Sequence, residues 1–424
     1  MLDESHARFG DIFTLKLAGV GRVVILSDAA AIKEVFALDG DAAHAGKANI
    51  VLKPFVGEHS LLLLDGHEHM RQRKLIMPAF HGERMAAYGR SMIELTHASI
   101  DDWPVGVTFP IHPRTQSITL QVILRTIFGI ASGPRFGQLA ELLTRAAGMV
   151  SSPAFLFPFM QKDLGRWSPW GRFVHTGNQV RAMLLAEIRR GRAEGTAGRT
   201  DVLAMMLDAR DEAGDPMSEN ELHDELLTLL LAGHETTATS LAWALRWILA
   251  DPDLTRELTD SLAETGGDVA KIAKHELLDF CVREALRLQP VIPLVGRVLQ
   301  EPLRVLGFDL PRNTSLAPAI YLVHRNEKLY PEPTRFLPRR YATFKPTPWE
   351  WLPFGGGLRR CIGATFAIFE MKMVLATVLP RVSMRLVRED RVRVVRRSIT
   401  LTPSEGLPVM LRVKRPRERS AHAA

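Results

Sequence analysis

Hydrophobic positions recur with a helical period over most of the middle of the chain. From about residue 67 to 290 this spacing predicts helices, interrupted where proline and glycine cluster. Alternating or β-branched runs near both ends predict short strands. These runs are FTLKL (13–17) and RVVILS (22–27), which form a hairpin before a helix at AAAIKEVFAL (29–38), then LRVLGFDLP (303–311), RVRVVRRSITLT (391–402) and LPVMLRVK (407–414). The pattern predicts a mainly α fold with small β-sheet portions, in one large domain over residues 1–414 with a basic, disordered tail at 415–424.

The most informative helix is predicted to begin after Ser218. Ser218 and Glu221 have the spacing of a capping box, and the apolar pattern then continues until Asp251-Pro252. Roughly 30 residues at 1.5 Å each make a rod of about 45 Å, which crosses a whole domain. Because its middle is apolar on nearly every side, the helix is expected to run through the core.

A polar stretch, AGHETT (232–237), interrupts this apolar helix. Ala232 and Thr236 are four residues apart and share a face, so a small residue lies beside a hydroxyl and suggests space next to the helix. The alternative is that Thr236 bonds back to a carbonyl of its own helix, which is common for a threonine in a helix interior.

Composition narrows the class of protein. The 424 residues include only two cysteines, Cys281 and Cys361, which argues against a disulfide framework and favours the cytoplasm. Cys281, in an apolar run, is expected to be a buried core residue. The formal net charge of +7 fits an acidic protein partner, whereas dispersed arginines without interleaved aromatic residues argue against nucleic acid. No apolar run is long enough to span a membrane.

Several catalytic motifs can be excluded. HEHMR (67–71) and HETTA (234–238) begin like zinc-protease helices, but Arg71 and Ala238 occupy the place of the second histidine. GGGLRR (355–360) is followed by cysteine rather than by the Lys-Ser/Thr of a phosphate-binding loop. No GxSxG elbow of a hydrolase is present.

The stretch PFGGGLRRCIGA (353–364) matches the haem-thiolate pattern F-x-x-G-x-R-x-C-x-G at every fixed position. Those positions are Phe354, Gly357, Arg359, Cys361 and Gly363. The chain therefore resembles the cytochrome P450 monooxygenases of the soluble bacterial type. The resemblance implies haem b (iron protoporphyrin IX), with Cys361 as its axial thiolate and a long central helix over the haem. Glycines let the loop turn sharply, and a cysteine at the start of the following helix would have its thiolate stabilised by free N–H groups.

Other family motifs follow in the expected order. By resemblance, Thr236 would hydrogen-bond the dioxygen and Glu235 would help to deliver protons. A buried structural network would join EALR (284–287) to FLPRRY (336–341). The remaining assignments implied by the resemblance are the network residues Glu284, Arg287 and Arg340, and the haem-propionate contacts His69, Arg73, Arg297 and Arg359.

The substrate pocket is predicted from aligned segments only. It would be lined by Ala232, Gly233, Ile292, Leu294 and Val295. The aromatic stretches PAFLFPFMQ (153–161) and GRWSPWG (165–171) would form a lid and entry channel, although aromatic residues that merely pack helices together remain an alternative. These apolar residues favour a lipophilic substrate such as a fatty acid, terpenoid, steroid or polyketide.

The resemblance implies a monooxygenase that inserts one atom of O2 into a C–H bond or a double bond. Electrons would come from a ferredoxin or flavodoxin with its NAD(P)H-dependent reductase, since the chain has no flavin or iron–sulfur motif. Arg360 and Lys74 are candidates for docking that partner. A peroxide-driven peroxygenase and a non-catalytic haem-binding or sensor protein remain alternatives. Family members usually carry more sequence before the first hairpin, so the N-terminus is either truncated or short.

Overall fold

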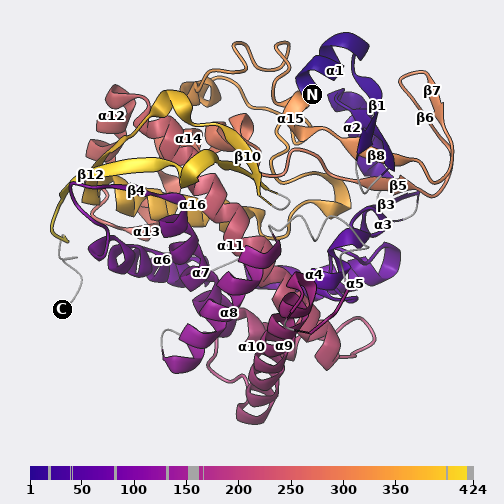
Figure 1. Cartoon of the computed structure of the whole chain (residues 1–424), viewed down its shortest axis with the longest axis horizontal. Coiled ribbons are helices and arrows are strands. Elements are labelled where there is room, and N and C mark those ends of the chain that lie inside the picture. The colour runs from indigo at the N-terminus through magenta and orange to yellow at the C-terminus, as the bar shows by residue number, and fades with distance from the viewer. Residues whose placement is uncertain are drawn as a thin grey trace.

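The computed structural model describes residues 1–17, 21–38, 40, 42–80, 84–129, 133–150, 162–165, 167–397 and 400–417. Helices form most of the described chain (Figure 1). In chain order these α-helices are α1 (Leu2–Phe9), α2 (Ala29–Ala37), α3 (Ala45–Ala48), α4 (Lys53–Val56), α5 (Gly66–Ile76), α6 (Arg84–Asp101), α7 (His112–Phe128), α8 (Pro134–Val150), α9 (Pro169–Glu194), α10 (Val202–Asp208), α11 (Glu219–Leu249), α12 (Pro252–Ala263), α13 (Val269–Lys274), α14 (Glu276–Leu288), α15 (Ile320–Val323) and α16 (Ala364–Arg381).

Short strands form two small sheets and two hairpins. The strands are β1 (Ile12–Leu17), β2 (Gly21–Leu26), β3 (Ala43–His44), β4 (Thr108–Pro110), β5 (Arg297–Leu299), β6 (Leu303–Val305), β7 (Phe308–Leu310), β8 (Ser315–Pro318), β9 (Val382–Leu386), β10 (Val394–Arg397), β11 (Thr400–Pro403) and β12 (Pro408–Lys414). One sheet has the order β1-β2-β8-β5-β3, with β2 and β8 parallel, and the other has the order β4-β12-β9. The two sheets lie on opposite sides of the view in Figure 1, with helices between them. The mainly α class with small β-sheet portions is confirmed.

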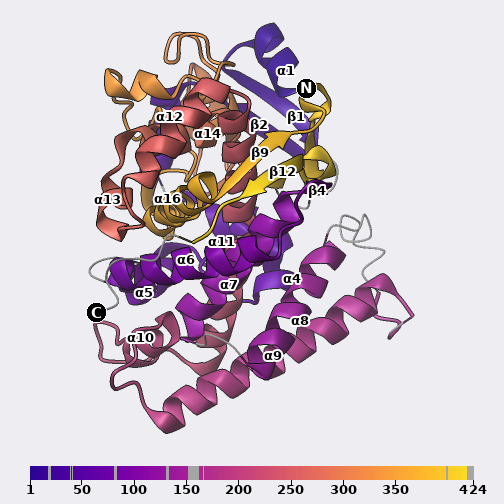
Figure 2. The ribbon, with the colours of Figure 1, turned by 90° about the vertical axis from the view of Figure 1, so that its left-hand side faces the viewer.

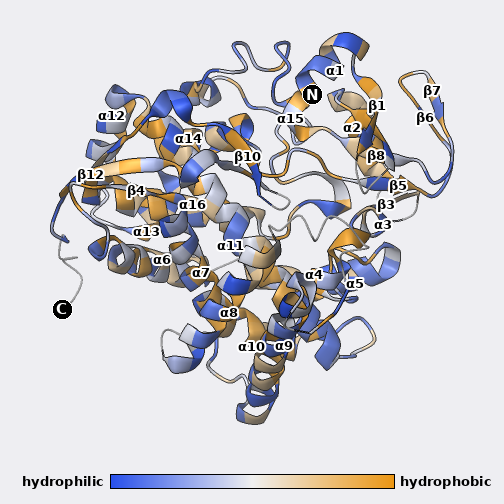
Figure 3. Cartoon of the chain, in the orientation of Figure 1, coloured by the Kyte–Doolittle hydropathy of each residue, from blue (hydrophilic) through white to orange (hydrophobic). Residues whose placement is uncertain are grey.

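The helices form layers around α11. Figure 2 shows α8, α9 and α10 together at one end, separated by α6 and α7 from the sheet of β4, β12 and β9. Helix α9 carries both hydrophobic and hydrophilic residues (Figure 3), and its buried residues recur every three or four positions, which is the pattern of a helix with one buried face. Of the helices in the described ranges, none has the length and apolar character needed to cross a membrane.

Helix α11 is confirmed as the central helix of 31 residues. The Ser218 hydroxyl accepts from the Glu221 N–H, and the Glu221 carboxylate accepts from the Ser218 N–H, so the predicted capping box is present. The helix ends at Leu249, just before Asp251-Pro252, because proline cannot continue a helix. Nearly every residue from Thr237 to Leu245 is buried, as the apolar pattern predicted.

The two ends of the chain follow the predicted elements. β1 and β2 form the first hairpin, and α2 follows with Asp28 as its N-cap. Arg415 and Arg417, the first residues of the predicted tail, are held in place: the Arg415 N–H donates to the Arg381 carbonyl, and Arg417 pairs with Asp101. The rest of that tail, 418–424, is outside the described residues.

Candidate active site

The loop before α16 is held in a tight turn by its glycines and by one backbone hydrogen bond. The Cys361 N–H donates to the Phe354 carbonyl oxygen at 2.9 Å, closing the loop. Gly357 has a φ of +65°, a region that favours glycine. A Cβ at Gly356 would lie 2.6 Å from the ring of Phe36, so only glycine lets the loop approach α2 this closely.

Cys361 precedes the helix rather than beginning it, which corrects the expectation from sequence. Helix α16 starts at Ala364 with Gly363 as its N-cap, after the turn that follows the loop closed by the Cys361–Phe354 hydrogen bond. Burial raises the pKa of the Cys361 thiol, while the Gly363 N–H and the guanidinium groups of Arg360 and Arg73 act in the opposite direction. The Gly363 N–H, Arg360 and Arg73 lower the pKa of the thiol, and they would therefore stabilise Cys361 as a thiolate ligand of a metal cation.

Cys361 and Ala232 both border open space inside the molecule. The Cys361 side chain is surrounded by protein, so that its thiol is desolvated, yet it remains accessible. Ala232 is exposed although it lies at the middle of α11, between stretches that are largely buried. An accessible alanine in a core helix indicates a hollow beside that helix.

Basic side chains from three parts of the chain converge near this loop. His69 on α5 is buried, and burial together with Arg359, Arg73 and Arg297, in that order of effect, lowers its pKa to about 3. Arg73 is also on α5, four residues after His69, and Arg297 begins β5. The structure therefore brings together the four residues that sequence resemblance placed at the haem propionates.

Arg359 is anchored to the segment that precedes α5. Its guanidinium donates to the Leu61 carbonyl oxygen at 3.0 Å and also contacts the Leu64 carbonyl and the Asp65 carboxylate. Asp65 in turn accepts from the Gly46 N–H at 2.9 Å. This set of contacts ties the cysteine loop to α3 and to the start of α5.

Glu235 and Thr236 point to different partners. The Thr236 hydroxyl donates to the Ala232 carbonyl at 2.6 Å, which is the alternative considered from sequence, and its oxygen remains able to accept a hydrogen bond. The Glu235 carboxylate accepts from the Gln116 amide of α7 at 2.5 Å. Burial raises the pKa of Glu235, against the effects of Gln116 and Arg397.

Glu284, Arg287 and Arg340 form one buried network. Arg287 donates to both carboxylate oxygens of Glu284, at 2.8 and 2.9 Å, and Arg340 donates to Glu284 at 3.0 Å. Arg287 also donates to the carbonyls of His324 and Pro333 at 2.7 and 2.8 Å. Glu284 and Arg287 have no exposed side-chain surface, so this is a fully desolvated, bidentate pair.

The model for the family described as cytochrome P450 matches residues 1–409. The chain is 40% identical over 416 residues to a protein designated cytochrome P450 135B1 in Mycobacterium tuberculosis, covering 98% of this chain and 87% of the relative. It is 37% identical over 407 residues to one designated cytochrome P450 138 from the same species, covering 96% and 90%. The chain belongs to the cytochrome P450 family.

A solved structure shares the fold of this P450. The retinoic acid-bound cyanobacterial CYP120A1 superposes with a TM-score of 0.85 at 25% identity, covering 96% of this chain and 93% of that one. P450s bind haem through a cysteine thiolate and act as oxidoreductases of the monooxygenase type. The expected fold, cofactor and enzyme class are therefore confirmed.

The residues of this P450 fit such a group. Haem carries iron and two carboxylates, and the chain offers an accessible thiol beside converging guanidinium groups. Arg73 lies close enough to Cys361 for their charges to interact, and no ion pair is found for it within the described ranges. A half-buried arginine without a carboxylate partner is costly, and a propionate would supply that partner. Cys361 would bind the iron, and His69, Arg73, Arg297 and Arg359 would surround the propionates.

Sequence reasoning missed His324, which links the buried network to the cysteine loop. The Leu352 N–H donates to Nε2 of His324 at 2.8 Å, so Nδ1 must carry the proton and donate to the Arg287 carbonyl at 3.1 Å. Burial, aided by Arg287, lowers the pKa of His324 to about 3 and keeps the ring neutral. A lone histidine between two proline-rich stretches gave no periodic signal that could have revealed this role.

The predicted pocket residues are not equivalent in the P450 structure. A Cβ at Gly233 would meet Ile123 of α7 at 3.2 Å, so Gly233 faces the helix interface and not the hollow beside Ala232. Leu294 and Val295 are partly buried against two different apolar clusters near the five-stranded sheet. Ile292 is also partly exposed.

The predicted lid is only partly described. PAFLFPFMQ (153–161) lies outside the described residues. Trp167 is 94% exposed, and Trp170 stacks near Phe173, whose ring also lies 5.1 Å from that of Phe55 on α4. Trp170 thus belongs to an aromatic cluster that joins α9 to α4.

The remaining residues singled out from sequence are the two docking candidates, Lys74 and Arg360, and the second cysteine, Cys281. Lys74 pairs with Glu212 at 2.6 Å, whereas Arg360 is exposed next to Cys361. Cys281 is fully buried in the main core, as expected.

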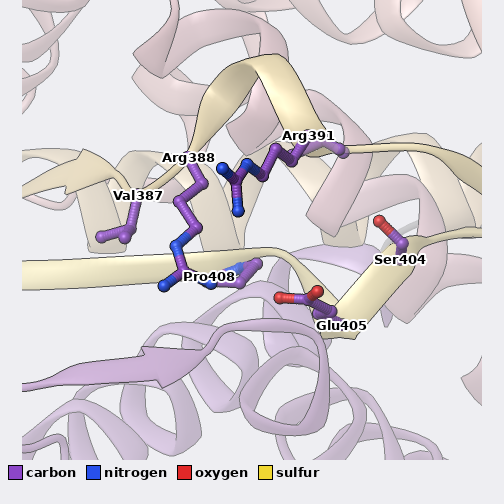
Figure 4. Close-up of a pocket in the computed structure, with 7 residues that line it drawn as sticks. Val387, Arg388, Arg391, Ser404, Glu405 and Pro408 are labelled. Carbon is purple, nitrogen blue, oxygen red and sulfur yellow. The ribbon is translucent and has the colours of Figure 1, made fainter.

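Two surface hollows lie away from Cys361. One, between β12 and the segment that follows β9, has a volume of about 10 Å³, with Arg388 and Arg391 on one side and Ser404 and Glu405 on the other (Figure 4). That volume holds about one water molecule, so this hollow is too small for a substrate. The other is an open groove between α8 and α9.

Proposed function

We propose that this P450 inserts one oxygen atom of O2 into a lipophilic small molecule, using electrons from a separate protein. When bound, haem would supply the oxygen-activating iron. The observation that carries the proposal is Cys361, which is accessible in a glycine-shaped loop beside Arg73 and Gly363, with family membership supplying the reaction class. Iron ligated by a thiolate favours cleavage of the O–O bond.

The substrate proposed here is a fatty acid, terpenoid, steroid or polyketide. Support comes from Ala232, a small apolar side chain exposed at the middle of α11, and from the apolar residues Ile292, Leu294 and Val295 in the connection before β5. The structural relative is described as bound to retinoic acid, which is itself a lipophilic molecule. Apolar pockets of this type bind ligands mainly through burial of hydrocarbon.

In this proposal Glu235 and Thr236 manage protons and water. The raised pKa of the Glu235 carboxyl makes it able to hold a proton closer to neutral pH than an exposed carboxyl can. Thr236 uses its hydrogen for the Ala232 carbonyl, so its oxygen would accept a hydrogen bond from water in the hollow. Glu235 argues against a peroxygenase, in which an arginine and a proline typically replace this pair.

A ferredoxin or flavodoxin is the electron donor that we propose, docking beside the exposed Arg360 with its NAD(P)H-dependent reductase. Lys74 is a weaker docking candidate because Glu212 already neutralises it. Two cysteines without a disulfide support a cytoplasmic location.

The test is the absorption spectrum of the purified protein after reduction and exposure to carbon monoxide. We expect the strongly red-shifted Soret band of thiolate-ligated haem, and its loss in Cys361→Ala. Cys281→Ala is the matched control and should keep the band, because Cys281 is buried in the core. A band at the position typical of histidine-ligated haem in the wild type, or a red-shifted band that survives Cys361→Ala, would contradict the proposal.

Once the thiolate band is established, reductase dependence separates the alternatives. A monooxygenase should consume NAD(P)H faster when lipophilic compounds such as fatty acids or terpenoids are added with a ferredoxin and its reductase. Turnover that needs only hydrogen peroxide would favour the peroxygenase. No turnover with either system, despite an intact band, would favour a haem-binding sensor.

A further inference from the structure

Helix α7 presents a polar face to α11 at the height of Glu235. The residues of this face are spaced by three and four positions, so they lie on one side of the helix. They are His112, Thr115, Gln116 and Thr119. A helix–helix contact in a protein core is normally apolar, and a polar stripe there must be satisfied by the facing helix.

Two threonines of this face fix the register between the helices. The Thr119 hydroxyl donates to the His234 carbonyl at 3.0 Å, and the Thr115 hydroxyl donates to the Ala238 carbonyl at 2.9 Å. Those carbonyls lie one residue before and three residues after Glu235. The backbone on both sides of Glu235 is therefore bonded to α7 and cannot slide along it.

The other two residues reach the Glu235 side chain itself. Gln116 Nε2 donates to Oε2 of Glu235 at 2.5 Å, whereas His112 Nε2 lies 3.9 Å from Oε1. The same His112 nitrogen is 3.1 Å from the Thr239 hydroxyl, which places the ring between Thr239 and the carboxyl. Within the described residues Oε1 has no hydrogen-bond partner.

A purely structural role does not account for this arrangement. Apolar residues at these positions would pack equally well without the desolvation cost of four polar side chains and a carboxyl. Gln116 instead gives one carboxyl oxygen of Glu235 a hydrogen bond and leaves the other buried without one. That asymmetry orients the carboxyl and leaves Oε1 as the atom available to carry a proton.

We propose that Gln116 and His112 are positioning residues for Glu235, and that Gln116 holds the carboxyl through Oε2 so that Oε1 carries its proton. This inference rests on the proposed function, because it assigns Glu235 to proton handling in the same site. Gln116 acts through Glu235 and is not itself a catalytic residue. His112 is held beside Thr239, and this places its ring 3.9 Å from the second carboxyl oxygen, Oε1.

Three elements place polar or titratable groups around Glu235. Helix α7 contributes His112 and the neutral amide of Gln116, β10 contributes Arg397, and α11 itself contributes His234. Burial is the main cause and Arg397 a lesser one of the lowering of the pKa values of His112 and His234 to about 4, so both rings are neutral at neutral pH. Gln116 and Arg397 are thus the groups that favour the ionised form of Glu235.

The experiment follows the protonation of Glu235 in the purified haem-loaded enzyme. The infrared band of protonated carboxyl groups is titrated against pH with carbon-13-labelled glutamate, and Glu235→Gln identifies the contribution of Glu235. Gln116→Met keeps the length of the side chain but removes the donor, and Gln116→Leu is a second variant in case the first does not fold. Gln121→Leu, on the same helix and bonded only to Ser117 among the described side chains, is the matched control.

We expect Gln116→Met to raise the titration midpoint of Glu235 by about one pH unit, because a hydrogen bond to the carboxylate is lost. His112→Phe should broaden or shift the carbonyl band of the protonated carboxyl, while Gln121→Leu changes neither quantity. An unchanged midpoint in Gln116→Met, or an equal change in Gln121→Leu, would overturn this inference. The red-shifted carbon monoxide band, recorded on the same samples, reports separately on the proposed function.

Discussion

At the scale of single residues, the buried acid Glu225 on α11 has no obvious role in the site. Its side chain has no exposed surface, and neither carboxyl oxygen has a hydrogen-bond partner among the described residues. Burial raises the pKa of Glu225 well above its usual range, with Asp224 and Glu221 acting in the same direction and the Leu61 N–H opposing them. The folded state therefore favours the protonated form of Glu225.

This proton makes stability depend on pH in a defined direction. Below the ordinary pKa of glutamate, both the folded and unfolded states carry the proton, so Glu225 makes no pH-dependent contribution to stability. Above it, only the folded state keeps the proton, and the free energy of unfolding should fall by about 1.4 kcal/mol per pH unit. In Glu225→Gln the side chain cannot ionise, so the free energy of unfolding lacks this pH dependence. The difference in unfolding free energy between the variant and the wild type, measured with urea, should therefore grow in favour of the variant as the pH is raised from 5 to 8.

Glu219→Gln is the comparison for that measurement. Glu219 lies on the same helix and pairs with Arg189 at the surface, which lowers its pKa. The stability gap between Glu219→Gln and the wild type should not widen in favour of the variant as the pH rises. A constant gap for Glu225→Gln would show that Glu225 is already ionised in the folded state.

Single residues can be proposed from sequence where a motif fixes several positions at once. Cys361 and its glycines were proposed because the spacing of five residues is hard to produce by chance. Gln116 was not found, because a polar stripe on a helix has the same sequence pattern whether it faces water or another helix. Only the fold shows that this stripe faces α11 and reaches Glu235.

At the scale of elements, the first turn of α11 is bonded to α5. Besides its part in the capping box, the Glu221 carboxylate accepts from Arg71 and from Gln72 at 2.6 Å each. Arg71 also pairs with Asp211 in the segment before α11. Since α5 carries His69 and Arg73, the start of the central helix fixes the helix that holds two of the basic residues.

Two variants should separate capping from this interhelical link. Ser218→Ala should cost about 1 kcal/mol of unfolding free energy, because it removes one N-cap hydrogen bond. Glu221→Ala should cost roughly 2–3 kcal/mol, since it also leaves the buried Gln72 without its acceptor and takes from Arg71 one of its two carboxylate partners. Chemical denaturation monitored by circular dichroism measures both.

The control is Glu219→Ala, in the same helical turn but with an exposed partner. It should change the unfolding free energy by less than about 0.5 kcal/mol. Equal costs for Ser218→Ala and Glu221→Ala would mean that the contacts with α5 contribute nothing to stability.

The start of a helix could be predicted from sequence only where the residues that fix it are close together in the chain. The start of α11 was predicted correctly because the capping box is encoded within four residues. The start of α16 was placed three residues too early, because the turn at Ile362-Gly363 is fixed by the closed loop from Phe354 to Cys361 and not by helix propensity. Likewise, Gly233 faces α7 because of how the helices pack, which the helical period alone cannot reveal.

At the scale of the whole molecule, the Glu284 network joins separate parts of the chain. It connects α14 to the segment 331–337 and to η5 (Pro338–Ala342), and His324 extends it to the residue before the cysteine loop. The fold class could be predicted from the hydrophobic pattern, and the members of this network from motifs. The pairing of β12 with β4 could not, because it joins positions far apart in sequence.

Breaking this network should destabilise the whole protein. Arg287→Met leaves Glu284 buried without its main partner, which should cost about 3–5 kcal/mol and lower the urea midpoint strongly. Arg283→Met, one turn earlier on α14, loses a half-exposed pair with Asp279 and the contact of its guanidinium with the Trp351 ring, and should cost about 1 kcal/mol. Similar midpoints for the two variants would show that the network does not limit stability.

The contact between Arg359 and Asp65 joins residues 294 positions apart. At a synthesis rate of about 5–20 residues per second, roughly 15 to 60 s separate the appearance of these two side chains on the ribosome. During that interval α5 and its basic residues exist without the cysteine loop. Capture of the cofactor by Cys361, as proposed here, must therefore await synthesis of the cysteine loop, long after the basic residues of α5 have been made.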